Sequence, residues 1–256
     1  MTSADCSPDT KPVLALNCCE ERLQMVLGTE DASSPQVLAS AEWTVPGRAV
    51  GFIAPGIQSM LSALGLKPGD IGGVACVRGP GSFTGLRLIL AAAAGFAAGV
   101  NIPTTGLDYL PLLAGQAATV HEGSILVVTY ARRGQVYLQH FRQGTALGPT
   151  EAMRATDAVE SIRKNAVNSA VLGSGLRKNP GVFDVLAEEG HKLLPPAFDN
   201  PSSTALLEAA LNATFDFEDI RPRYIRMSDA EENLETFAAK RGLSPEEARK
   251  RLHDYE

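Results

Sequence analysis

Short apolar runs along the chain predict two sets of strands. Continuous runs of this length are typical of buried strands. In the first hundred residues they lie at Pro12–Leu16, Arg22–Gly28, Val37–Trp43 and Val74–Val77. Polar residues 17–21 separate the first two runs, so we expect these to pair as a hairpin. Later runs predict strands at 124–129, 135–141 and 170–172, the first two joined through a turn at Arg132-Arg133-Gly134.

Apolar residues three or four positions apart predict helices between these strands. The expected helices span Gly47–Gly65, Ser82–Gly99, Leu107–Ala118, Thr156–Lys164, Pro180–Glu189 and Ser203–Thr214. We expect Thr156 to cap the fourth and Ser202 or Ser203 the last. Residues 222–227 are predicted as a short strand or an extended segment. Two further helices are predicted after Ser228, the second starting at the capping box Ser244-Pro245-Glu246-Glu247.

The helix at Ser82–Gly99 is apolar around its whole circumference. One face carries larger side chains, at Leu86, Ile89, Leu90, Ala93, Phe96 and Ala97, and the other carries Leu88, Ala91, Ala92, Gly95 and Gly99. A helix that is hydrophobic all round must be covered on both sides. Its small-residue face therefore predicts close approach of another helix, from this chain or from a partner. The uncharged stretch Leu88–Val100 is too short to span a bilayer, so we expect no membrane association.

The loop before this helix is rich in glycine. It reads Arg78-Gly79-Pro80-Gly81-Ser82-Phe83-Thr84-Gly85, and Ser82 or Thr84 can cap the helix. A helix N-terminus of this kind can bind an anion, here through Gly79, Gly81, Ser82, Thr84, Gly85 and Arg87. The spacing matches neither the P-loop nor G-x-G-x-x-G. A tight strand-to-helix connection is the alternative interpretation.

The predicted order of strands and helices resembles the ribonuclease-H-like lobe shared by actin, Hsp70 and sugar kinases. We therefore predict an α/β fold with two such lobes of the actin/Hsp70/sugar-kinase (ASKHA) type. The expected divisions are a disordered lead-in (1–11), a first lobe (12–105), a second lobe (106–227) and a helical tail (228–256). In that superfamily the first hairpin usually carries an Asp that organises the metal and nucleotide. This chain has Asn17 there, and a neutral amide is a poor Mg²⁺ ligand.

The segment Val77–Arg87 resembles the signature of the TsaB (YeaZ) family. Weaker matches follow at 131–137, 171–175 and 222–226, so the resemblance covers about Val13 to Arg226 and leaves out the tail. TsaB is the non-catalytic partner of TsaD in the bacterial synthesis of threonylcarbamoyladenosine in tRNA. Relatives often have Asp before Ala-Arg where this chain has Tyr130, so a second candidate acid is missing. The resemblance thus implies a subunit without catalytic residues or a metal site.

The resemblance also implies where a partner docks. In TsaB-like proteins the two helices beside the glycine loop pack on the equivalent pair of TsaD, and the same helices can pair in a homodimer. The corresponding positions here are Ile53, Ile57, Met60, Leu64, Leu88, Ala91, Ala92 and Gly95. We further expect TsaE in the same complex and no intrinsic cofactor, with ATP or ADP at the partner interface.

Two other functions stay open from the sequence. One is a nucleotide-dependent ATPase or phosphotransferase of the ASKHA class that uses the 78–87 loop and Arg87, against which stand Asn17 and Tyr130. The other is a homodimer with an unrelated scaffold role.

Composition narrows these functions further. The net charge is −6 and no Lys/Arg cluster stands out, so we expect tRNA contact only through the complex. Four cysteines without C-x-x-C spacing fit a reducing cytoplasm, and the polar lead-in lacks an apolar signal core. The four histidines are scattered, so a zinc protease site is not expected. Ser82 lacks an identifiable general base, which favours a capping role.

Overall fold

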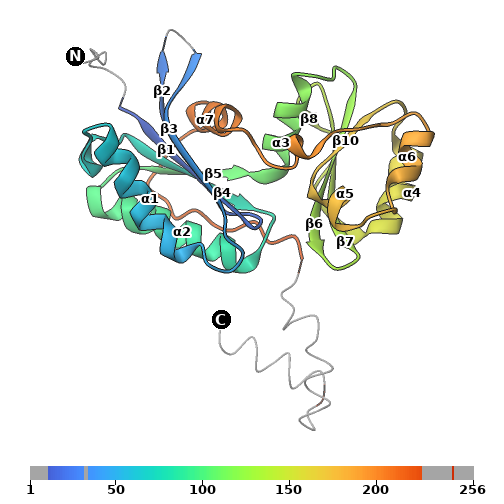
Figure 1. Ribbon diagram of the computed structural model, residues 1–256, viewed down its shortest axis with the longest axis horizontal. Coiled ribbons are helices and arrows are strands. Elements are labelled where there is room, and N and C mark those ends of the chain that lie inside the picture. The colour runs from blue at the N-terminus through green and yellow to red at the C-terminus, as the bar shows by residue number, and fades with distance from the viewer. Residues whose placement is uncertain (1–10, 32–33, 227–243, 245–256) are drawn as a thin grey trace. The chain divides into compact units, whose positions relative to one another are not determined.

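The computed structural model of the chain describes residues 11–31, 34–226 and 244 (Figure 1). Residues up to Arg223 form one compact unit, which holds both sheets, and the chain beyond Arg223 is counted as a second unit. The predicted tail helices fall outside the described residues, as does most of the lead-in. The boundaries proposed for lead-in, lobes and tail stay predictions.

The first sheet has five strands in the order β3-β2-β1-β4-β5. The strands are β1 (Val13–Asn17), β2 (Arg22–Asp31), β3 (Ser34–Thr44), β4 (Gly73–Gly79) and β5 (Thr104–Asp108). β1 to β3 form an antiparallel meander, and β4 and β5 add in parallel beside β1. This mixed order is that of a ribonuclease-H-like lobe, as predicted. β5 was not predicted, because Thr104-Thr105-Gly106 breaks the apolar run.

The second sheet repeats this topology. Its strands are β6 (Ser124–Arg132), β7 (Gln135–Arg142), β8 (Thr145–Ala146), β9 (Glu151–Arg154), β10 (Ala170–Leu172) and β11 (Lys192–Leu193). β6 and β7 are an antiparallel hairpin, β8 and β9 each pair antiparallel with β7, and β10 and β11 add in parallel beside β6. The sequence pattern missed β8, β9 and β11, which have only two to four residues each. The repeat confirms the two-lobed ASKHA-type fold.

Helices cover both faces of the first sheet (Figure 1). α1 (Val50–Ala63) and α2 (Phe83–Val100) pack on one face, and α7 (Ser203–Leu211) packs on the other. Residues of β2 contact helices on both faces of the sheet: Met25 lies against Gly56 of α1, and Gly28 lies against Leu207 of α7. α3 (Tyr109–Ala118) contacts both sheets. The chain therefore returns to the first sheet after completing the second, although the sequence had suggested that α7 belongs to the second lobe.

Shorter helices complete the second lobe. α4 (Ala155–Asn165), α5 (Ser174–Lys178) and α6 (Asp184–Glu188) surround a core that includes Phe183 and Ile162. Single turns of 3-10 helix lie at Pro68–Asp70 and Pro196–Phe198. Two predictions were wrong here. Arg154, not Thr156, occupies the N-cap position of α4, and α6 is shorter than the predicted 180–189. Residues 222–226 contain no strand, which leaves the extended segment of the two alternatives.

Candidate functional site

Helix α2 is capped at both ends by its own sequence. The Oγ of Ser82 accepts the Gly85 N–H (3.3 Å), which confirms the predicted N-cap. Asn101 ends the helix in a left-handed conformation. Only 28% of α2 is buried, mainly the stripe that faces β4. By length and composition alone this eighteen-residue helix is able to cross a membrane. The expectation that this segment is too short to span a bilayer is therefore not supported by the length of the helix. In the structure, however, α2 packs on the first sheet.

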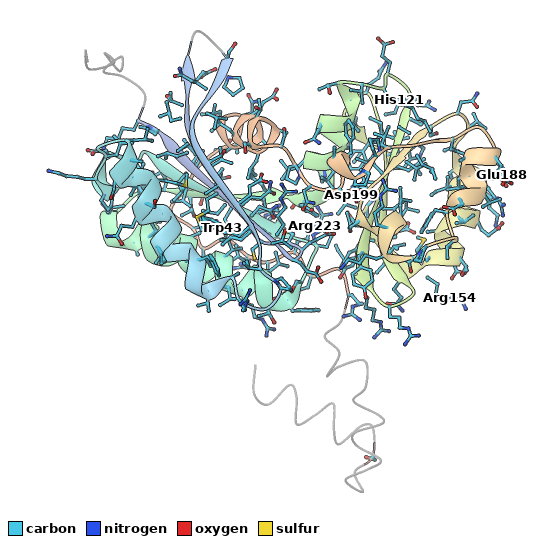
Figure 2. All side chains as sticks on the ribbon, in the orientation of Figure 1. Trp43, His121, Arg154, Glu188, Asp199 and Arg223 are labelled. Carbon is cyan, nitrogen blue, oxygen red and sulfur yellow. The ribbon has the colours of Figure 1, made fainter. Side chains whose placement is uncertain are left out.

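Helix α1 turns its periodic apolar face toward its own sheet. Ile53, Ile57 and Met60, three of the residues expected at a partner contact, are 5%, 8% and 6% exposed and belong to the core of the first lobe. Trp43 of β3 packs against Phe52 of α1, with ring centroids 5.8 Å apart (Figure 2). These three residues are therefore not an open face, because the sheet already covers them.

A groove nevertheless opens between α1 and α2. We call it the α1–α2 groove; its volume is about 560 Å³, and it is lined by Ile53, Ala54, Ile57, Gln58, Leu61, Ser62, Leu66, Pro68, Ala92, Gly95 and Phe96. Four of the eight predicted contact residues thus line it, from both helices. No charged side chain is part of its lining. The other four lie outside it: Leu64 follows the end of α1, Met60 is in the core, Leu88 is half-buried and Ala91 faces the opposite side of α2.

The glycines of the two helices differ in what surrounds them. A Cβ at Gly56 of α1 would lie 2.9 Å from Met25 Sδ and 3.0 Å from the Trp43 ring, so internal packing requires a glycine there. A Cβ at Gly95 or Gly99 of α2 would meet nothing within 4 Å. Glycine inside a helix costs about 1 kcal/mol relative to alanine. Nothing within the described chain offsets that cost at Gly95 and Gly99, so these positions leave room for a close approach from outside.

The glycine loop packs on the turn between β1 and β2. A Cβ at Gly81 would lie 2.2 Å from the Cys19 carbonyl oxygen, and one at Gly85 equally close to that of Cys18. The Ser82 N–H donates to the Cys19 carbonyl oxygen (2.6 Å). Two glycines and one backbone donor of the proposed anion site are thus explained by this contact. The structure supports the tight-connection interpretation of the loop.

The arginines near the loop are engaged as well. Arg78 Nε donates to Asp108 Oδ1 (2.8 Å), and Arg223, labelled in Figure 2, pairs with the other oxygen of the same carboxylate. The Arg87 guanidinium lies over the Phe83 ring, 5.9 Å from its centroid. Gly79 adopts φ +113° beside the Arg223 carbonyl oxygen, and Thr84 is exposed on the first turn of α2. The role of this loop in anion or nucleotide binding stays a prediction.

A polar cluster joins the two lobes at Glu20, Ser174 and Tyr130. Ser174 Oγ donates to Glu20 Oε1 and accepts the Tyr130 N–H (2.9 Å). Lys178 Nζ lies 3.2 Å from Glu21 Oε1 and 5.5 Å from the centre of the Tyr130 ring. Burial raises the pKa of Glu20 to about 7; the Ser174 hydrogen bond opposes this, while the Asp199 carboxylate adds to it. The predicted Gly173-Ser174-Gly175 turn thus meets a carboxylate of this chain.

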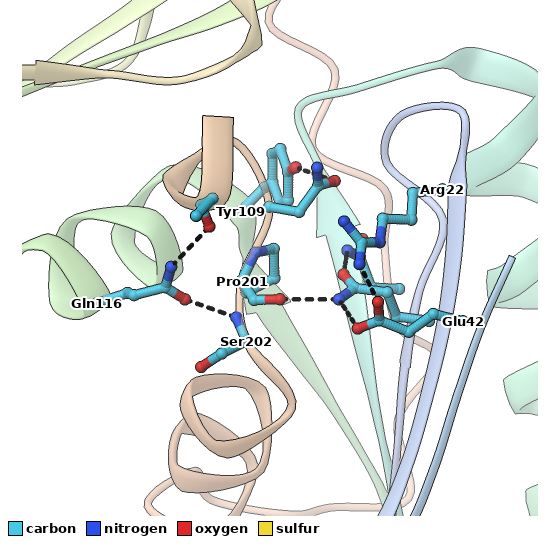
Figure 3. Close-up of polar contacts among 10 residues, drawn as sticks. Arg22, Glu42, Tyr109, Gln116, Pro201 and Ser202 are labelled. Atoms are coloured by element: carbon cyan, nitrogen blue, oxygen red, sulfur yellow. Dashed lines mark hydrogen bonds and ion pairs between the residues drawn. The ribbon is translucent and has the colours of Figure 1, made fainter. Parts of the chain in front are cut away.

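Asn17 is held within the first lobe. Its Nδ2 donates to Gln24 Oε1 (2.7 Å), and its Oδ1 accepts the Cys19 N–H (3.0 Å). Gln24 Nε2 in turn donates to Glu42 Oε1 (2.8 Å) and to the Pro201 carbonyl oxygen (2.7 Å) (Figure 3). Both ends of the Asn17 amide are therefore used for structure.

The segment that enters α7 is fixed from both sides. Figure 3 shows Gln116 of α3 bonded to the Ser202 N–H, and Arg22 paired with Glu42 beside Pro201. Sequence reasoning missed Glu20, Gln24 and Ser202 in these roles. Their partners lie 86 to 177 positions away along the chain, which no local spacing reveals.

The cysteines and the possible metal ligands form no reactive site in the described residues. Cys18, Cys19 and Cys76 are free and buried, and burial raises the pKa of the Cys18 thiol to about 11. Within the described ranges, no three His, Cys, Asp or Glu residues gather closely enough to hold a metal ion.

Comparison with known proteins agrees with this picture. The family model for TsaD, tRNA N6-adenosine threonylcarbamoyltransferase, matches residues 51–207. The chain is 27% identical over 227 residues to the tRNA threonylcarbamoyladenosine biosynthesis protein TsaB of Bacillus subtilis (86% of this chain, 96% of that protein). It is 32% identical over 157 residues to TsaB of Escherichia coli (57% and 68%).

Solved structures show the same fold. The structure of YeaZ from Pseudomonas aeruginosa superposes with a TM-score of 0.59 at 20% identity, covering 93% of this chain and 97% of that one. A second Pseudomonas aeruginosa structure, described as similar to peptidase YEAZ, gives a TM-score of 0.65 at 19% identity (84% and 100%).

The doubled ribonuclease-H-like topology gives the chain a fold of the actin/Hsp70/sugar-kinase type. Within that class the matches in sequence decide the assignment: the chain belongs to the TsaB (YeaZ) family.

Proposed function

We propose that this chain is the non-catalytic TsaB subunit that binds and activates TsaD in forming N6-threonylcarbamoyladenosine in tRNA. The assignment to the pathway follows from the family, whose members carry the name tRNA threonylcarbamoyladenosine biosynthesis protein. One observation carries the partner role: Gly95 and Gly99 lie on α2, and a Cβ at either would meet no atom of the described residues within 4 Å. A partner helix packed closely in the α1–α2 groove would use both the space and the apolar lining.

The proposal includes the working context of the subunit. It acts in the cytoplasm, has no cofactor of its own and reaches tRNA only within the complex. TsaE joins the same complex, and ATP or ADP binds at the partner interface. The α1–α2 groove can also pair two copies of this chain, and TsaD competes with that homodimer.

The alternative function is an ATPase or phosphotransferase of the ASKHA class. Two features weigh against it: Asn17 is bonded to Gln24 and Cys19, and Glu20 reaches Ser174 across the cleft. Isothermal titration of the isolated chain with ATP and Mg²⁺ separates the two functions. Tight binding with turnover would favour the enzyme, and the proposal expects neither.

Co-purification with TsaD from the same organism tests the partner role. Gly95→Glu places a carboxylate in the groove, and the open space around Gly95 lets the lone protein fold normally. Burying that charge without a counter-ion costs several kcal/mol, so we expect affinity for TsaD to fall at least about 100-fold. Ala92→Glu, in the same groove, should act in the same direction.

The matched control is Ala187→Glu on α6, an exposed alanine of the second lobe. It adds the same charge away from both α1 and α2 and should leave TsaD binding unchanged. TsaD retained by Gly95→Glu at the wild-type level would contradict the proposed contact.

A further inference from the structure

A second groove lies on the side of α2 that faces away from α1. Its volume is about 330 Å³. α2, the turn after it and the chain that follows α7 line this groove, at Leu90, Ala91, Ala94, Ala97, Ala98, Asn101, Ile102, Thr104, Phe217, Glu218, Asp219 and Ile220. We call it the Phe217 groove.

The wall that carries Phe217 is fixed to the edge of the first sheet. Thr104 and Asp216 exchange two backbone hydrogen bonds (2.7 and 3.0 Å), and Thr104 Oγ1 donates to the Glu218 carbonyl oxygen (3.2 Å). Phe215 turns inward against Gly73, whereas the Phe217 side chain is 74% exposed. A large aromatic side chain is thus held in solvent on an anchored backbone. Phe, like Tyr and Trp, is enriched at the buried core of protein interfaces relative to the rest of the surface.

The two grooves lie on either side of α2. Ala92 and Gly95 line the α1–α2 groove, while their neighbours Ala91 and Ala94 line the Phe217 groove. The exposed residues of α2 therefore form a ridge of small side chains between two apolar hollows. A partner bound in the α1–α2 groove therefore needs to extend only across the width of α2 to reach the Phe217 groove.

The rims of the grooves differ in charge. The α1–α2 groove has only Gln58 and Ser62 as polar lining residues. The Phe217 groove carries Glu218 and Asp219, both exposed, and neither forms an ion pair within the described part of the chain. A partner that covers this rim therefore needs positive charge.

We propose that the partner that docks in the α1–α2 groove extends across α2 into the Phe217 groove, where it packs apolar side chains flanked by Lys or Arg against Phe217. This inference rests on the proposed function and adds a second contact to it. Phe217 is the anchor of that contact, and Glu218 and Asp219 orient the partner.

Affinity measurements with purified TsaD at low and high salt test the inference. Phe217→Ala should weaken binding at least tenfold, because it removes an aromatic anchor while the exposed position leaves the fold intact. The charge reversal Glu218→Lys/Asp219→Lys should slow association at low salt and lose most of its effect at high salt, because salt screens exposed charges. Val167→Ala, an 81% exposed residue of the second lobe, is the control and should bind like wild type.

The outcomes separate this inference from the proposed function. If Gly95→Glu abolishes binding while Phe217→Ala and the charge reversal both bind like wild type, the second contact is overturned and the proposed function stands. If wild type does not bind TsaD, both are overturned. A thermal melt of each variant confirms that loss of affinity does not arise from loss of fold.

Discussion

Two surfaces of the first lobe differ in how far the chain's own side chains cover them. The cleft toward the second lobe is filled by its own polar side chains: Glu20 meets Ser174, and Lys178 meets Glu21. The face of α2 is left open, with two grooves and glycines that nothing crowds. The polar contacts of this lobe thus face the second lobe, and its open apolar grooves lie on the outer helices.

The largest loss of stability should come from substituting the glycines that pack against the β1–β2 turn. Gly81→Ala or Gly85→Ala would place a Cβ 2.2 Å from a backbone carbonyl oxygen, which cannot move without shifting the β1–β2 turn. We expect a loss of more than about 3 kcal/mol in the free energy of unfolding, comparable to severe overpacking. Gly69→Ala, where a Cβ meets nothing within 4 Å, is the matched control and should change stability little. Denaturant titration measures both, and equal stabilities would disprove the close packing of the loop.

The cleft makes a prediction about pH. The folded-state pKa of Glu20 is raised to about 7 from the ordinary 4.5, so the folded state holds its proton to higher pH than the unfolded state. Wild-type stability should therefore fall as pH rises from about 4.5 to 7, and Glu20→Gln should remove that part of the slope. The difference is at most roughly 3 kcal/mol. Chemical unfolding of both proteins at pH 5 and pH 8 measures it, and parallel pH profiles would rule out a buried, protonated Glu20.

The smallest expected change in stability comes from a substitution on the open face of α2. Gly95→Ala should raise the stability of the isolated chain by about 0.4–1 kcal/mol, because it restrains the unfolded chain without any clash. The same methyl group should weaken TsaD binding by keeping the partner helix away. A thermal melt and an affinity measurement on one preparation test the opposite signs. Gly56→Ala, which meets Met25 and Trp43, should gain no stability.

The sequence predicted the parts of the fold that rest on long apolar patterns. β1 to β4, α1, α2 and the Ser82 cap were placed closely, since burial on a sheet imposes a clear period. Strands of two to four residues carry too little pattern to be seen, and β5 is interrupted by polar residues. At the candidate site, periodicity identified the apolar face of α1 but not its direction. Met60 is buried against the sheet and lines neither groove, whereas Ile53 and Ile57 pack in the core and also line the α1–α2 groove. The most regular apolar stripe of a helix is the one its own core uses.

Contacts between distant segments escaped prediction for a different reason. Glu20 and Ser174 are 154 positions apart, and Gln24 and Pro201 are 177 apart. Such pairs exist only once both lobes have folded and met. The glycine loop was recognised from sequence, but its contact with Cys18 and Cys19 depends on the neighbouring turn.

The return of α7 to the first sheet has a consequence during synthesis on the ribosome. α7, with the buried Leu206 and Leu207, covers a face of the first sheet, whose last strand β5 ends at Asp108, 95 residues before α7 begins at Ser203. At roughly 5–20 residues per second, the nascent first lobe waits several seconds or more with that face bare. The first lobe reaches its native state only after α7 has emerged from the ribosome, and until then that apolar face is open to solvent and to chaperones.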